Sequence, residues 1–308
     1  MSISEHLTTF AGLPIVTYPT KDMPPDPGAV AWRVSSSEFD DGDTEFAEVL
    51  KSLTDEPWAA GVTALVIGQW EEAYDEAIPD EVLLTALRRL PALTALFLGE
   101  MTFEECEISW IHHGNITPVF AACPGLRTFA VRGASELVLE PVRHESLRSL
   151  TIESGGLPAS VVAAVCASDL PALEHLELWL GDGYYGGDTD VADLAPILSG
   201  SRFPRLTSLG LKDSEIADAI AAAVAGAPVV ARLRHLDLSM GVMTDAGGAA
   251  LLAGQPLTHL TRLDLHHHYM SEPVLERLRA EIAAAGVDLD LSDAEGADSD
   301  ERYVAVAE

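Results

Sequence analysis

The fold is decided by four stretches of the sequence: LEHLELWL (173–180), LTSLGLKD (206–213), LRHLDLSM (233–240) and LTRLDLHH (260–267). Each stretch places apolar residues at its first, fourth and sixth positions. The later positions alternate between apolar and mostly polar residues, which indicates a short β-strand with one buried face. The last three stretches begin 27 residues apart, so the chain repeats one structural unit.

The same pattern recurs along most of the chain. The ten copies begin at Ala29, Val62, Leu93, Leu126, Leu147, Leu173, Leu206, Leu233, Leu260 and Gly286. Between copies, apolar residues such as Ile216, Ile220 and Val224 recur at a helical spacing. One strand–turn–helix unit cannot bury its own apolar face, so the units must stack. We therefore predict an α/β solenoid of horseshoe shape, with a parallel sheet on the concave side and helices on the convex side.

Three parts of the chain are distinguished by composition. We expect a cap at 1–28, a solenoid of about nine to ten repeats at 29–293, and an acidic linker with a strand-like tail at 294–308. Residues 1–28 contain five prolines, which favours an irregular cap. Residues 302–306 (RYVAV) have β-propensity. This tail is expected either to fold back as a cap or to dock on a partner by strand addition.

The repeats resemble leucine-rich repeats of the ribonuclease-inhibitor type. The motif resemblance covers residues 29 to 293, although the asparagine expected after each strand is mostly missing. The stretches FAGLP (10–14), LTIESGGLPASVV (150–162), LDLHHHY (263–269) and RYVAV are similar to an uncharacterised family of bacterial leucine-rich-repeat proteins. Members of that family tend to be encoded near radical-SAM and ATP-grasp-like proteins. The resemblance implies a partner in a peptide- or metabolite-modifying system, and it implies no catalytic residues.

The charge of the chain restricts its partners. The 308 residues include 49 acidic and 18 basic side chains, a net charge of −31. Such a surface repels phosphates, so we expect neither nucleic acid nor an anionic membrane as partner. Basic proteins, peptides or cations are favoured, although the charge could also serve solubility alone. Neither a membrane-length apolar run nor a signal peptide is recognised, so we expect a cytoplasmic protein.

Three cysteines, Cys106, Cys123 and Cys166, lie far apart in the sequence. Their number is odd, and their spacing matches neither a disulfide framework nor a metal site. We expect them to be buried as small apolar residues.

The concave face follows from the alternation of the repeat. The third, fifth and seventh positions of each copy should point into the hollow. The fifth positions run from Val66, Phe97, Ala130 and Thr151 to Glu177, Gly210, Asp237, Asp264 and Asp290, so an apolar half is followed by an acidic half. Acids on neighbouring strands lie about 4.8 Å apart and repel each other, so basic groups should compensate them.

Three loops leave the carboxyl ends of strands and should gather on one rim, at 68–80, 99–117 and 179–190. They carry Trp and Tyr, which are enriched in binding hot spots, although these side chains could instead pack on their own loops. The candidate binding residues of the concave face and rim are His175, Glu177, Trp179, Tyr184, Tyr185, His235, Asp237, Arg262, Asp264, His266 and Trp110.

The predicted function is a non-catalytic scaffold for a protein or peptide that uses neither a cofactor nor a metal. A sharper alternative is a metal-dependent or accessory enzyme subunit, in which His235, Asp237, Asp264 and His266 supply the metal ligands. A third alternative is that the protein is itself a substrate modified at its tail. No nucleotide-binding or hydrolase motif is present in the sequence.

Overall fold

The computed structural model describes residues 3–36, 45–297, 299 and 301–308. Its strands form a single sheet of twelve, in which sequence order is also spatial order. Every neighbouring pair is parallel except β1 and β2, which form an antiparallel hairpin. The strands are β1 (Thr9–Phe10), β2 (Leu13–Thr17), β3 (Ala31–Val34), β4 (Ala64–Ile67), β5 (Ala95–Leu98), β6 (Thr128–Arg132), β7 (Ser149–Glu153), β8 (His175–Gly181), β9 (Ser208–Ser214), β10 (His235–Asp237), β11 (Arg262–Asp264) and β12 (Asp288–Asp290).

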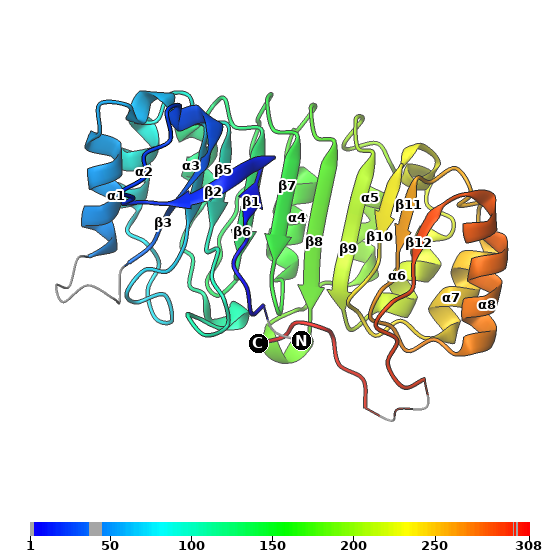
Figure 1. The fold of residues 1–308 in the computed structure, drawn as a ribbon. Coiled ribbons are helices and arrows are strands. Elements are labelled where there is room, and N and C mark those ends of the chain that lie inside the picture. The colour runs from blue at the N-terminus through cyan, green and yellow to red at the C-terminus, as the bar shows by residue number, and fades with distance from the viewer. Residues whose placement is uncertain (1–2, 37–44, 298, 300) are drawn as a thin grey trace.

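The helices lie on one face of this sheet (Figure 1). They are α1 (Phe46–Asp55), α2 (Asp80–Arg88), α3 (Thr117–Ala122), α4 (Ala159–Ala167), α5 (Ala195–Leu198), α6 (Ala217–Val224), α7 (Asp245–Ala253) and α8 (Glu272–Glu281). Short 3₁₀ turns complete the repeats: η1 (Pro27–Ala29), η2 (Ala59–Gly61), η3 (Ile108–Trp110), η4 (Gly183–Tyr185), η5 (Val191–Leu194), η6 (Pro228–Arg232) and η7 (Ala283–Ala285). Across the described ranges, no helix has the length and apolar character needed to cross a membrane.

The ten strands from β3 to β12 coincide with the ten copies of the sequence pattern, which confirms the predicted solenoid. Residues at the fourth position stack strand to strand in register, as Leu209, Leu236, Leu263 and Leu289 do. Leu209, Leu236 and Leu263 are at most 1% exposed. The main core lies between the sheet and the helices, because each strand directs this row toward the helical layer. All three cysteines are buried and unpaired, as predicted.

The first 28 residues are more regular than the sequence indicated. Strand β2 pairs in parallel with β3 and so extends the sheet by one strand. Strand β1 turns back on β2 and crosses the open face of the sheet (Figure 1). The hairpin turn is formed by Ala11 and Gly12, which both have positive φ, as two-residue hairpin turns of type I′ require. The prolines of this segment gave no indication of a hairpin.

The tail also departs from the predicted strand. Residues 302–306 form no strand, yet Val304, Ala305 and Val306 are buried. The tail runs back along the carboxyl ends of the strands to a position below β8 (Figure 1), where Ile3 packs against the cluster that contains Ala305 and Val306. It thus takes the first of the two predicted outcomes, folding onto the rim of the solenoid.

Candidate functional site

The open face of the sheet, opposite the helices, is called the concave face below. Its amino-terminal half is apolar and carries the side chains of Ala64, Val66, Ala95, Phe97 and Ala130, which pack together with Phe10. The ring centroids of Phe10 and Phe97 lie 5.6 Å apart. The β1–β2 hairpin therefore covers this apolar half with a part of the chain itself.

A buried carboxylate fixes the segment that leads into this hairpin. The backbone N–H of Leu7 donates to Oε1 of Glu100 at 2.9 Å, and the same carboxylate forms an ion pair with Arg33. Glu100 is fully buried and Arg33 nearly so. Because both groups are buried, breaking their ion pair would be costly, and Glu100 therefore holds the segment firmly through the Leu7 N–H.

The carboxyl-terminal half of the concave face carries the predicted polar row. Glu177 is in register with Gly210, Gly210 with Asp237, Asp237 with Asp264, and Asp264 with Asp290. These residues therefore lie side by side on neighbouring parallel strands, as the repeat predicted. The acids therefore form one row, interrupted only at Gly210, that needs compensating positive charge.

Lys212 compensates one end of this row. Its Nζ lies 3.5 Å from Oε1 of Glu177 and 3.3 Å from Oδ2 of Asp237. Burial alone would raise the pKa of Glu177. Hydrogen bonds from His175 and Trp179 and the charge of Lys212 lower that pKa to about 2. Glu177 is therefore ionised at any physiological pH.

Arg262 compensates the other end. Its guanidinium contacts Asp264 at 2.7 Å, Asp290 at 2.9 Å and Asp288 at 2.6 Å. Burial works to raise the pKa of Asp264, but hydrogen bonds from His266 and Arg262 hold it well below its usual range. One arginine thus holds three carboxylates of two neighbouring strands.

The histidines of the predicted site occupy different positions around this row. His266 Nδ1 lies 2.8 Å from Oδ1 of Asp264, and this hydrogen bond raises the pKa of His266. His175 Nε2 lies 3.5 Å from Oε2 of Glu177. The side chain of His235 is exposed beside Asp237. In the described part of the chain, no three His, Cys, Asp or Glu side chains are grouped so that they could hold a metal ion.

Trp179 is not available at the surface, contrary to its selection as a rim contact residue. It belongs to β8, is 8% exposed, and packs in a cluster with Ile108, Met240, Ala305 and Val306. Its Nε1 donates to Oε1 of Glu177 at 2.8 Å. The indole therefore links the acidic row to the C-terminal tail, and the tail covers it.

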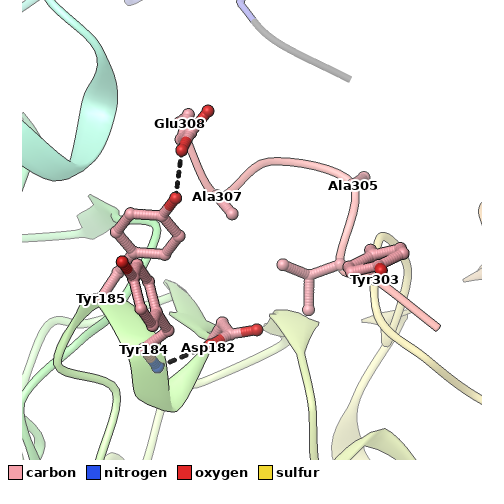
Figure 2. Close-up of a pocket in the computed structure, with 8 residues that line it drawn as sticks. Asp182, Tyr184, Tyr185, Tyr303, Ala305, Ala307 and Glu308 are labelled. Atoms are coloured by element: carbon pink, nitrogen blue, oxygen red, sulfur yellow. Dashed lines mark hydrogen bonds between the residues drawn. The ribbon is translucent and has the colours of Figure 1, made fainter. Parts of the chain in front are cut away.

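The other three aromatic candidates remain on the rim. Trp110 is 46% exposed and stacks on Tyr74 with ring centroids 6.3 Å apart. Tyr184 is 87% exposed and meets Tyr185 edge to face. The Tyr185 hydroxyl donates to the carboxylate of Glu308 in the tail (Figure 2). The rim therefore presents exposed rings at Trp110 and Tyr184.

The tail is held by its backbone as well as by its side chains. The N–H of Ala305 donates to the carbonyl oxygen of Met240 at 2.8 Å, and the N–H of Val306 donates to Oδ1 of Asp213 at 2.9 Å. Ser109 donates its hydroxyl to the carbonyl oxygen of Ala307. These contacts join the tail to strand β9, to the turn after β10 and to the loop after β5.

Asp213 is the least expected of these partners. It is fully buried, its Oδ2 has no hydrogen-bond partner among the described residues, and its backbone has positive φ. Burial raises the pKa of its carboxyl group to about 8, although the Val306 N–H and the charge of Lys212 oppose the shift. Asp213 is therefore largely protonated at neutral pH and can be buried without a full negative charge.

Sequence reasoning missed Lys212 and Asp213, and it did not place the hairpin on the concave face. Lys212 could have been found, because it holds the seventh position of its repeat and is in register with Trp179. No local signal marks Asp213, whose contact with Val306 spans 93 residues of sequence. A periodic sequence pattern carries no information about such long-range contacts.

Comparison with known proteins assigns this chain to a family. No protein-family model matches the sequence, and no curated protein matches it. A crystal structure of a Bacteroides fragilis protein from a structural-genomics programme is 30% identical, with a TM-score of 0.75. That match covers 80% of this chain and 70% of the Bacteroides chain.

Two more distant structures share less with this chain. An internalin (InlF) of Listeria monocytogenes is 15% identical with a TM-score of 0.33, over 83% of this chain and 89% of the internalin. TLR13 in complex with ssRNA13 is 16% identical with a TM-score of 0.39, over 76% of this chain and 33% of TLR13. With ten stacked parallel strands from β3 to β12 and its helices on one face of the sheet, the chain is a leucine-rich-repeat solenoid, and it belongs to the same family as the Bacteroides fragilis protein.

Proposed function

We propose that this protein is a non-catalytic scaffold that binds a positively charged segment of another protein on the carboxyl-terminal half of its concave face. The observation that carries the proposal is the difference between the two halves of that face. The β1–β2 hairpin packs Phe10 onto the apolar half, while the half from β8 to β12 carries its charges without such a cover. The charged half is therefore the part of the concave face that remains open to a partner.

The charge balance of this half selects the partner. Five carboxylates, those of Glu177, Asp237, Asp264, Asp288 and Asp290, face two permanently charged bases, Lys212 and Arg262. Their low pKa values keep Glu177 and Asp264 ionised, so the internal bases leave an excess of negative charge. Basic side chains on a bound segment would meet this row, and electrostatic attraction would speed their association.

We expect no catalysis by this chain, because the acids of the row, His175 and His266 are engaged with one another and with Arg262 and Lys212. The resemblance to bacterial leucine-rich-repeat proteins encoded near peptide-modifying enzymes makes such an enzyme, or its peptide substrate, a partner to test. A metal-dependent accessory role would require the four residues His235, Asp237, Asp264 and His266 to rearrange around an ion.

A peptide selection tests the proposal while the natural partner is unidentified. The full chain is immobilised and used to select from a phage-displayed library of twelve-residue peptides. We expect the enriched peptides to be rich in Lys and Arg, and to bind more weakly as salt concentration rises. Their affinity is then measured for the triple variant Glu177→Gln, Asp237→Asn, Asp288→Asn. This variant removes three charges from the concave row and retains a side-chain oxygen at each position.

The matched control removes the same charge from the opposite face. Glu272, Glu276 and Glu281 are exposed on helix α8, and their triple change to Gln alters the net charge equally. The proposal requires the concave variant to weaken binding by about tenfold or more while the α8 variant retains it. Selection of neutral or acidic peptides, or an equal loss in both variants, would show that the concave row is not the binding surface.

A further inference from the structure

A separate pocket lies on the rim, between the turn after β8 and the C-terminal tail (Figure 2). Its volume is about 500 Å³. It is lined by Asp182, Tyr184, Tyr185, Tyr303, Val304, Ala305, Ala307 and Glu308. The lining combines three aromatic rings, two carboxylates and a floor of small apolar side chains. It is separated from the acidic row of the concave face by the buried Trp179.

Two of the rings form adjacent walls. The rings of Tyr184 and Tyr185 meet at 82° with their centroids 5.0 Å apart. Tyr303 lies on the opposite side of the pocket (Figure 2). The face of an aromatic ring carries partial negative charge and attracts a cation placed over it. Tyr185 stays a neutral phenol, because its hydrogen bond to Glu308 raises its pKa to about 12.

In each of the two carboxylates, one oxygen accepts a hydrogen bond from the protein. Oδ1 of Asp182 accepts the backbone N–H of Tyr184 at 2.6 Å, and Oε1 of Glu308 accepts the Tyr185 hydroxyl. These contacts fix both groups and leave each a second oxygen. Neither carboxylate takes part in an ion pair among the residues that the structure describes. The pocket therefore has negative charge without an internal base.

The geometry discriminates between kinds of cation. A metal ion would require several oxygen ligands around one point, and no such group occurs in the described ranges. A guanidinium prefers two oxygens of one carboxylate in a fork, whereas each carboxylate here has one oxygen engaged. An ammonium group needs single oxygens and aromatic faces, and the apolar floor of Val304, Ala305 and Ala307 suits a methylene stem.

We propose that this rim pocket binds an alkylammonium group, either a lysine side chain of a protein or a free small amine. The site does not depend on the concave face, since its lining comes from the turn at 182–185 and the tail alone. The tail supplies half of the pocket, so the site is present only while the tail is docked.

The binding is tested by NMR on the full, isotope-labelled chain. The probes are the capped tripeptide Ac-Gly-Lys-Gly-NH₂, the free amine cadaverine, and Ac-Gly-norleucine-Gly-NH₂ as the uncharged counterpart. We expect saturable shifts of the backbone amides at 182–187 and 303–307 with a charged probe, and none with the norleucine peptide. A response to the lysine peptide alone would identify a protein segment as the ligand, and a response to cadaverine alone would identify a small amine.

Three variants separate charge, aromaticity and folding. The double change Asp182→Asn, Glu308→Gln keeps both structural hydrogen-bond acceptors, and we expect it to weaken binding by about tenfold. Tyr184→Leu should weaken it by about threefold, while Tyr184→Phe keeps the ring and should retain it. The charge-matched control, Glu72→Gln with Glu76→Gln, lies on a different rim loop and should bind as the natural chain does.

The proposal is wrong if the norleucine peptide shifts the same amides with equal affinity. It is also wrong if the Asp182 and Glu308 double variant binds as well as the control variant. Neither result depends on the concave face, so failure here is distinguishable from failure of the proposed function.

Discussion

The backbone N–H of Val306 donates a hydrogen bond to Oδ1 of the buried Asp213, with a donor–acceptor distance of 2.9 Å. This bond joins the tail to strand β9 and closes the tail over Trp179. The tail is thereby an integral part of the rim and covers the apolar surface beneath it.

Deletion of residues 302–308 should therefore destabilise the solenoid. Val304, Ala305 and Val306 are at most 5% exposed, and losing their burial should lower the free energy of unfolding by on the order of 2 kcal/mol. Chemical denaturation measures this change. The fluorescence of Trp179, isolated by comparison with Trp179→Phe, should shift to the red. Unchanged stability together with an unshifted Trp179 would mean that the tail is not docked in solution.

Docking of the tail should also depend on pH through Asp213. Its pKa is raised in the folded chain to about 8, above the usual value near 4 of an aspartate. The stability contributed by the protonated carboxyl is fully present below pH of about 4 and is lost as the pH rises to about 8. We expect Trp179 fluorescence to shift toward that of the tail-deleted protein as the pH rises toward about 8.

The control for this titration is Asp213→Asn. Asparagine tolerates the positive φ at this position and cannot ionise. The pH response of Trp179 should disappear in this variant. A response of the same size in the variant would assign the titration to another group.

Lys212 should stabilise the concave face by holding two acids. Lys212→Met removes the charge that Glu177 and Asp237 share, and should lower the free energy of unfolding by about 1–3 kcal/mol. It should also raise the pKa of Glu177, which NMR titration measures. The matched control is Lys51→Met, whose ion pair with Asp55 is exposed on α1 and should leave the unfolding midpoint unchanged. Equal effects of the two changes would contradict the role given to Lys212.

The repeat itself is tested by Leu236→Asp. Leu236 is 1% exposed in the stacked row, and a buried, unpaired carboxylate costs several kcal/mol. We expect circular dichroism to show a loss of the cooperative thermal transition. Its neighbour Asp237 faces the opposite side of β10, so Asp237→Asn should retain the fold. A folded Leu236→Asp variant would mean that the row does not form the core.

The features that could be predicted from the sequence are those that its local periodicity determines. Alternation at Leu236 and Asp237 assigns one residue to the core and the next to the concave face, and strand register then aligns Asp237 with Asp264. Long-range contacts were not predictable in this way. The packing of Phe10 on Phe97 and the bond between Val306 and Asp213 depend on where the ends of the chain return.

The central claim is that a basic segment binds in the acidic half of the concave face. A basic peptide from the selection, carrying a photoreactive benzoylphenylalanine, is irradiated on the full chain and the adducts are mapped by mass spectrometry. The account predicts adducts on the concave residues of β8 to β12, within 175–179, 208–212, 235–237, 262–264 and 288–290. Adducts confined to the convex helices, or to the hairpin-covered strands β3 to β6, would contradict it.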